Sequence, residues 1–154
     1  MRNSHTIMQL KRSTDILLRI LLYLASHPEL ERVSIQDLST LINWNKNLVV
    51  KVAHMAVQSG LLKAVRGCTG GLSLARHPRE YLIGDIIRMC EGDEPLLDCH
   101  APPCPLLGLG CGLRGTLENA RENFYRELNK VTLVDLVPSS HKAETRVNFP
   151  KKIR

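Results

Sequence analysis

Apolar residues in the first sixty positions recur at helical spacing in three separate segments. Residues 13–27 are apolar on almost every side and stop at Pro28, which predicts a helix that is buried on more than one face. Two shorter segments, 33–43 and 46–59, each carry one apolar stripe. Residues 43–45 are expected to form a tight turn between them. The pattern therefore predicts one helix followed by a helix-turn-helix.

Polar residues at the predicted helix starts support these boundaries. Ser13, Thr14 and Asp15 offer side-chain oxygens that could cap the first helix, and Asp15 is most simply explained as a cap. Ser34 and Asp37 resemble a capping box for the second helix. The third helix is expected to turn one set of apolar side chains inward, namely Leu48, Val49, Val52, Met55 and Ala56.

A helix-turn-helix binds double-stranded DNA by placing the start of its second helix in the major groove. Trp44, in the turn, could lie against a sugar or anchor the turn in the core, and we favour the core. Amide, hydroxyl and ammonium groups suit base edges and phosphates. The residues expected to contact DNA from this unit are Ser34, Gln36, Trp44, Asn45, Lys46, Asn47 and Lys51.

The pattern changes to that of two short strands after Gly60. Residues 61–66 and 72–76 flank a glycine-rich segment, which predicts a β-hairpin directly after the helix-turn-helix. Such a hairpin is the wing of a winged helix, and we expect Arg66, Gly70, Gly71 and Arg76 to lie against DNA. A hairpin that only covers the core is the alternative. No role is assigned to Cys68, which would lie at the tip.

The second half of the chain predicts a short helix, a loop and a long helix. The short helix covers 83–91 and places Cys90 among apolar neighbours, as a buried residue and not a ligand. The long helix, 113–130, has a narrow apolar stripe that suits pairing with a second subunit, or else folding back onto its own domain. Glu122 and Arg126 are spaced for mutual support. The stripe consists of Leu113, Leu117, Ala120, Phe124, Leu128 and Val131.

Three cysteines lie in the loop between these helices. Cys99, Cys104 and Cys111 follow the spacing Cys-x4-Cys-x6-Cys, among prolines and glycines that exclude regular structure. Converging thiolates suit a soft metal, either the iron of an iron–sulfur cluster or zinc. His100 lies too close to Cys99 to be an obvious fourth ligand. A disulfide with a spare thiol, or three unconnected cysteines, remain the alternatives.

Charge and composition narrow the possible functions. Residues 1–76 hold ten Lys and Arg against four Asp and Glu, whereas 77–137 hold six against ten. The basic half is suited to binding a polyanion, and on composition alone a merely solvated surface is an equal alternative. No apolar run reaches the ~18 residues that a membrane span needs. The absence of an export signal and the odd number of cysteines, five, predict a cytoplasmic protein with reduced thiols. Without a Cys-x-x-Cys pair or a cysteine with His and Asp partners, a thiol enzyme is the weaker hypothesis.

The order of these motifs resembles that of the iron–sulfur winged-helix transcriptional regulators, the family of IscR and NsrR. The resemblance runs over residues 8–137 and is strongest to the nitric-oxide-sensing NsrR branch. It implies a mainly helical fold with a small β-hairpin. Its landmarks are Met8-Gln9-Leu10, Ser13-Thr14-Asp15, Val65-Arg66-Gly67, Gly70-Gly71-Leu72, Ile83-Gly84-Asp85, the three cysteines and Thr132-Leu133-Val134-Asp135-Leu136-Val137.

The resemblance also implies an organisation and a mechanism. An N-terminal extension (1–7) precedes a winged helix-turn-helix (8–82), a cluster-binding loop with a dimerisation helix (83–137) and a basic tail (138–154) that we expect to be disordered. The homodimer would repress genes through a cluster, 4Fe-4S as first choice and 2Fe-2S as second, that nitric oxide attacks. Asp15 from the other subunit would then be the fourth ligand beside the three cysteines. A response to iron, cluster supply or redox state, or a zinc site, remains the alternative.

Overall fold

The computed structural model describes residues 9–138 except 66, 68, 69, 101, 107, 108 and 110. Arg66, Cys68, the predicted extension 1–7 and the tail beyond residue 138 therefore lie outside the described residues. The predicted fold class, mainly helical with a small β-hairpin, is confirmed. The elements are α1 (Arg12–Ser26), α2 (Ile35–Leu41), α3 (Lys46–Gln58), β1 (Leu62–Val65), β2 (Gly71–Leu74), α4 (Ile83–Glu91) and α5 (Gly112–Leu128), with 3-10 helices η1 (Pro78–Glu80) and η2 (Leu133–Leu136).

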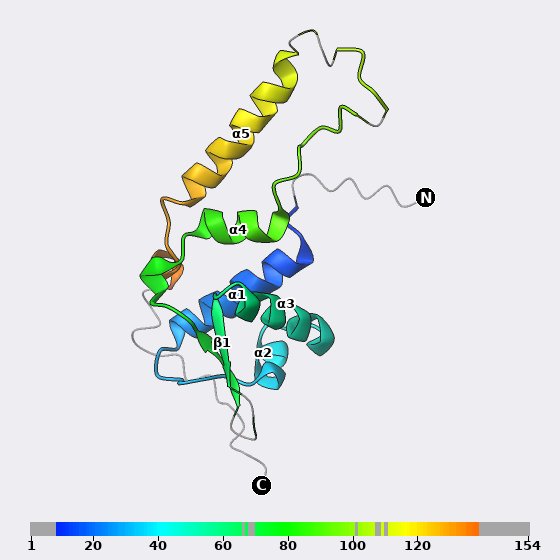
Figure 1. Ribbon diagram of the computed structural model, residues 1–154. Helices are drawn as coiled ribbons and strands as arrows, with labels where there is room; N and C mark the ends of the chain where they lie inside the picture. The colour runs from blue at the N-terminus through cyan, green and yellow to red at the C-terminus, as the bar shows by residue number, and fades with distance from the viewer. Residues whose placement is uncertain are drawn as a thin grey trace.

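Helix α1 lies at the centre of the core. Ile16, Leu17, Ile20 and Leu21 are at most 1% exposed, as expected of a helix that is apolar on almost every side. Helix α3, strand β2, helix α4 and η2 all pack against it. The winged helix is thus assembled around α1, and α4 joins this body to α5 (Figure 1).

The start of α1 differs from the prediction. Its N-cap is Lys11, and no side chain caps it locally, so the expected capping by Ser13, Thr14 or Asp15 is wrong. The carboxylate of Glu91, at the end of α4, instead accepts hydrogen bonds from the Lys11 backbone N–H (2.8 Å) and from the Thr14 hydroxyl. A carboxylate from a distant helix therefore accepts from one backbone N–H and one hydroxyl at the start of α1.

The helix-turn-helix follows the predicted order with a shorter second helix. Ser34 Oγ accepts from the Asp37 backbone N–H (3.1 Å), which confirms the predicted cap. Asn43 adopts a φ of 54°, which ends the helix before the turn. The backbone N–H of Trp44 donates to Ser39 O (3.0 Å). The Trp44 side chain is half-buried and packs against the core, which is the alternative we favoured.

Helix α3 has a different buried face from the one predicted. Val49, Val52 and Ala56 are buried as expected, but Leu48 is 37% exposed. Ala53 takes the inward position at 2% exposure. The prediction counted Leu48 as inward because it directly precedes Val49 in an apolar run. In a helix successive side chains point in different directions, so Leu48 faces away from the core when Val49 faces it.

Strands β1 and β2 form the predicted antiparallel hairpin, with Leu62 opposite Leu74 and Val65 opposite Gly71. Val33 and Leu72 exchange two backbone hydrogen bonds of 2.9 Å, which attaches the hairpin to the segment before α2. A Cβ at Gly71 would lie 2.8 Å from Val33 O. Glycine is therefore required there by the close approach of two backbones.

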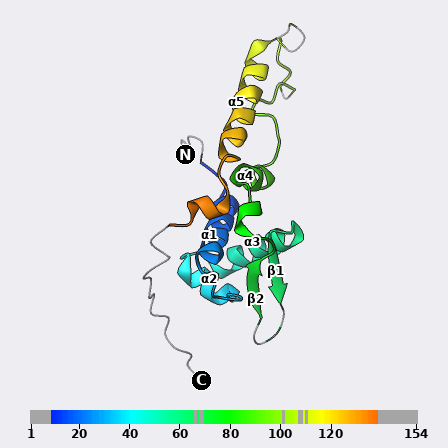
Figure 2. The same ribbon diagram turned by 90° about the vertical axis from the view of Figure 1, so that its left-hand side faces the viewer.

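Helix α5 projects away from the winged helix, and the described part of the cysteine loop runs alongside it toward its far end (Figures 1 and 2). Its apolar stripe is divided between two environments. Leu128 and Val131 pack against the core, whereas Leu113 and Phe124 are 57% and 38% exposed. Only the end of the stripe folds back onto its own domain. No helix among the described residues has the length and apolar character to cross a membrane.

Candidate functional site

The first part of the candidate site is the outer face of α3. Lys46, Asn47 and Lys51 are exposed there, on the side opposite the buried residues. Asn45 Oδ1 accepts from the Asn47 backbone N–H (2.9 Å), so Asn45 caps α3 and keeps only its amide nitrogen as a free donor group. This face presents ammonium and amide donors together, as binding to phosphates and base edges requires.

The start of α2 and the wing lie beside each other. A hollow of about 300 Å³ lies between these two segments and is lined by Ser34, Gly70 and Gly71, among others. Gln36, two residues after Ser34, is exposed. The Ser34 hydroxyl already donates to Asp37 Oδ2 (2.7 Å). The predicted cap therefore engages the Ser34 hydroxyl both as donor and as acceptor, and its contact with DNA stays a prediction.

Arg76 lies at the base of the hairpin, away from the glycine-rich tip. Its guanidinium carbon is 5.1 Å from the centre of the Tyr81 ring, a cation–π distance. The side chain is exposed. Its contact with DNA stays a prediction, and Arg66, the other wing arginine, lies outside the described residues.

The second part of the candidate site is the cysteine loop. Cys99 and Cys104 are half-buried, and the Cys104 N–H donates to Cys99 O (2.9 Å), which closes a turn between them. Cys111 is exposed and is the N-cap of α5. Cys90 is half-buried against the core, and burial raises the pKa of its thiol. All four described cysteines are free thiols.

Asp15 lies in the first turn of α1 and is not a cap. Its Oδ1 forms an ion pair with Arg19 Nε at 2.7 Å, and its side chain is 39% exposed. This hydrogen bond to Asp15 raises the pKa of Arg19. The Asp15 carboxylate is therefore accessible to solvent, and the residue that holds it, Arg19, is itself exposed.

The described residues of one chain do not assemble a complete metal site, since no three His, Cys, Asp or Glu side chains among them converge. The donor set nevertheless fits an iron–sulfur cluster chemically. Cys99, Cys104 and Cys111 are three free thiols on one loop that could hold a cluster, and the Asp15 carboxylate could add an oxygen. One hard oxygen among three soft sulfurs is a ligand that exchanges readily.

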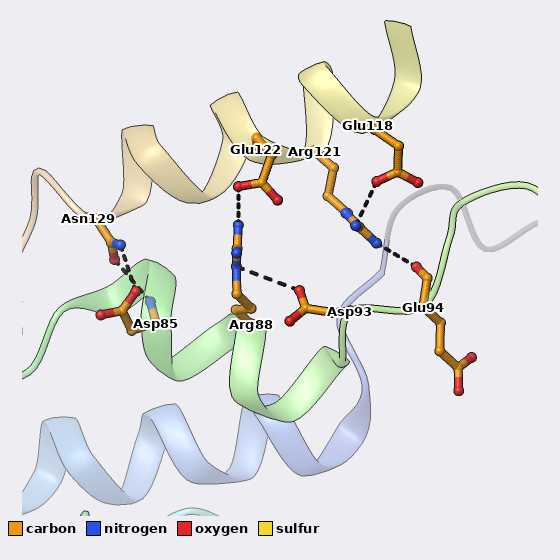
Figure 3. Close-up of polar contacts among 8 residues, drawn as sticks. All are labelled: Asp85, Arg88, Asp93, Glu94, Glu118, Arg121, Glu122 and Asn129. Carbon is orange, nitrogen blue, oxygen red and sulfur yellow. Dashed lines mark hydrogen bonds and ion pairs between the residues drawn. The ribbon is translucent and has the colours of Figure 1, made fainter. Parts of the chain in front are cut away.

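Two arginines hold the root of the cysteine loop between α4 and α5 (Figure 3). Arg121 Nη1 donates to Glu94 O (2.5 Å), and its other terminal nitrogen pairs with Glu118 (2.6 Å). Arg88 Nη2 pairs with Glu122 (2.5 Å) and its Nε lies 3.8 Å from Asp93. The loop thus leaves the body of the protein from a position set by both helices.

Sequence reasoning missed this network. We predicted that Glu122 pairs with Arg126 on its own helix, but Glu122 pairs with Arg88, which is 34 residues away. The Arg88 guanidinium also lies 4.5 Å from the centre of the Tyr125 ring. The only available signal was a set of charges on each helix, which does not reveal a partner on another element.

The pair between Arg88 and Glu122 predicts a pH effect. Its hydrogen bond lowers the pKa of Glu122, so the stabilisation is present at neutral pH and is lost as the pH falls through the lowered pKa. Arg88→Gln is expected to raise the pKa of Glu122, as measured by a carbon-13 NMR titration of the carboxyl group. Lys130→Gln, which removes the exposed partner of Glu127, should leave it unchanged. An unchanged Glu122 titration in Arg88→Gln would contradict the pairing.

Comparison with known proteins identifies the family. The Rrf2 family, described as iron-dependent transcriptional regulators, matches residues 10–139. The chain is 35% identical over 132 residues to the HTH-type transcriptional regulator NsrR of Halalkalibacterium halodurans, covering 84% of this chain and 90% of the relative. It is 34% identical over 133 residues to NsrR of Geobacillus kaustophilus, with the same coverages.

Solved structures show the same fold. CymR, described as the global cysteine regulator of B. subtilis, matches with a TM-score of 0.66 and 24% identity, over 84% of this chain and 96% of that one. IscR of T. potens matches with a TM-score of 0.66 and 23% identity, over 84% and 85%. These two proteins thus share the fold of this chain. The chain belongs to the Rrf2 family of transcriptional regulators, which are DNA-binding proteins and not enzymes.

Proposed function

We propose that this chain is a homodimeric repressor whose affinity for operator DNA is controlled by an iron–sulfur cluster that senses nitric oxide. The observation that carries the proposal is the donor set of the loop, three free thiols at Cys99, Cys104 and Cys111, in a chain with NsrR relatives at 34–35% identity. Asp15 of the second subunit would complete the set. A 4Fe-4S cluster is the first choice and a 2Fe-2S cluster the second.

The exposed part of α5 supports a dimer. Helix α5 stands away from the winged helix (Figure 2). Leu113 and Phe124 on it are 57% and 38% exposed and belong neither to the core nor to the half-buried residues packed against it. An apolar stripe on an otherwise charged helix is suited to a second copy of the same helix. Two copies would present two α3 helices to a pseudo-palindromic operator with half-sites about one DNA turn apart.

In this proposal the chain's own groups couple the loop to the DNA-binding face. A bound cluster would supply iron atoms that small molecules such as nitric oxide can attack. Asp15 would be the exchangeable ligand, and its carboxylate pairs with Arg19 on the same helix. Because Asp15 belongs to α1, whose core contacts include α3, holding or releasing it affects the placement of the recognition helix. A tenfold change in DNA affinity requires only ~1.4 kcal/mol of difference between two states.

The test is an anaerobic preparation titrated with nitric oxide while visible absorption and DNA binding are followed together. The probe is a duplex that the wild-type protein selects from a random pool. We expect a coloured protein with iron and sulfide, whose DNA affinity falls about tenfold or more as the colour is lost. Cys104→Ala should lack iron, and Asp15→Ala should alter the response to nitric oxide. Cys90→Ala is the matched control and should behave like the wild type.

Two results would overturn the proposal. The cluster is excluded if oxygen-protected protein holds neither iron nor sulfide and still binds the duplex fully. Nitric oxide control is excluded if binding persists after the colour is bleached.

A second candidate, a regulator that responds to iron or to cluster supply, is favoured by the description of the family as iron-dependent. In that case iron chelation during growth would change repression, whereas nitric oxide would not. A colourless protein with bound zinc would point instead to a zinc-binding regulator, and reversible oxidation of the loop thiols to a redox regulator.

A further inference from the structure

One aliphatic side chain lies among the polar groups of the recognition helix. Val50 is the fifth residue of α3 and is 42% exposed, whereas its neighbour Val49 is fully buried. Val50 belongs neither to the core nor to the half-buried residues that pack against it. Its two methyl groups therefore face solvent at the end of α3 that would enter the groove.

Helical spacing places Val50 beside the predicted DNA contacts. It follows Lys46 by four residues and Asn47 by three, so these side chains share a face of the helix. Lys46 and Asn47 are both exposed. An aliphatic group at this position neither donates to a phosphate nor accepts from a base. Val50 can therefore make only apolar contacts, whereas Lys46 and Asn47 can form hydrogen bonds.

The major groove offers one apolar group for such a side chain, the 5-methyl group of thymine. Valine suits this contact because its branched Cβ is restricted to one main rotamer in a helix, which fixes its methyl groups close to the backbone. Leu48, the other exposed aliphatic residue of this helical turn, is 37% exposed. It is two residues from Val50 and so points to another side of α3.

We propose that Val50 is a specificity-determining residue that contacts the 5-methyl group of a thymine in each operator half-site. This inference rests on the proposed function, since it requires α3 to read operator DNA. It adds the chemical feature that is read at one position: a methyl group in the major groove, which separates thymine from cytosine and from uracil.

The experiment removes that methyl group without changing the hydrogen-bonding edge of the base. A duplex selected by the wild-type protein is remade with deoxyuridine replacing thymidine at one symmetric pair of positions at a time. At one such pair we expect the wild-type Kd to rise about fifteenfold, because one methyl contact is lost in each half-site at ~0.8 kcal/mol each. Fluorescence anisotropy measures Kd, and thermal unfolding confirms that each variant is folded.

Variants assign the effect to Val50. Val50→Ala should bind the thymidine and deoxyuridine duplexes equally, at the affinity of the wild type for the deoxyuridine duplex. Because Val50 is exposed, this variant should unfold at the wild-type temperature. Leu48→Ala is the matched control and should keep the wild-type discrimination of about fifteenfold.

The inference is overturned if no deoxyuridine substitution weakens wild-type binding, or if Val50→Ala discriminates as well as the wild type. Either result leaves the proposed function standing, because the selected duplex is still bound. If the wild type selects no sequence from the pool, both the proposed function and this inference fail.

Discussion

Gly84→Val is expected to lower the free energy of unfolding by about 3 kcal/mol. Gly84 lies in α4 where this helix crosses α5, and a Cβ there would lie 2.3 Å from Tyr125 O and 2.5 Å from Asn129 Oδ1. The first of these atoms is backbone and cannot rotate away. Asn129 is also engaged, since its Oδ1 accepts from the Asp85 N–H (2.9 Å) and its amide donates to Asp85 Oδ1 (2.7 Å).

The measurement is urea unfolding followed by circular dichroism. Gly115→Ala is the matched control, because Gly115 lies in helix α5 and a Cβ there would meet nothing within 4 Å. The Gly115→Ala variant should have a free energy of unfolding up to about 1 kcal/mol higher than the wild type, because alanine has a higher helix propensity than glycine. If Gly84→Val unfolds like the wild type, α4 and α5 are not in contact in solution. The position of α5 relative to the winged helix would then need to be revised.

Tyr81→Phe is expected to cost about 2 kcal/mol, although it removes a single oxygen atom. The Tyr81 hydroxyl donates to Leu61 O (2.7 Å) and accepts from the N–H groups of Ala75 and Arg76 (3.0 Å each). Tyr81 is 1% exposed, so water cannot easily replace these bonds. The Arg76 N–H would lose its partner, and the Ala75 N–H and Leu61 O would each keep only their bond to one another (3.1 Å).

Tyr23→Phe provides the contrasting variant. The Tyr23 hydroxyl is buried and has no hydrogen-bond partner among the described residues, and burial raises its pKa. Removing it should leave stability unchanged or slightly increased, because no bond is lost and a buried polar atom is removed. Thermal unfolding of both variants under the same conditions tests the pair. Equal effects of the two substitutions would contradict the hydrogen bonding assigned to Tyr81.

Much of the candidate DNA-binding face could be predicted from sequence. The cap at Ser34, the turn before α3 and the glycine-rich hairpin depend on contacts between residues close in the chain, so local patterns reveal them. Exposed Lys46, Asn47 and Lys51 follow from the same periodicity. Val50 was not noticed, because in sequence it is one more apolar residue in an apolar run.

The loop site was only partly predictable. The spacing of Cys99, Cys104 and Cys111 indicates a soft-metal ligand set whatever the fold. What supports the loop could not be found in this way. The Glu91 carboxylate accepts a hydrogen bond from the start of α1, and Arg121 of α5 donates one to the Glu94 carbonyl. Both bonds join segments that are far apart in the chain.

The amino-acid sequence by itself determined the order and type of the elements, the wing and the identity of the candidate ligands, since periodicity, caps and cysteine spacing are local properties. The tertiary structure alone decided which charges pair, which half of the α5 stripe is covered and which aliphatic side chains of α3 stay exposed. The physical reason is that burial and ion pairing depend on the relative placement of helices. That placement is set by packing around α1 and α4 and is not encoded in any single segment.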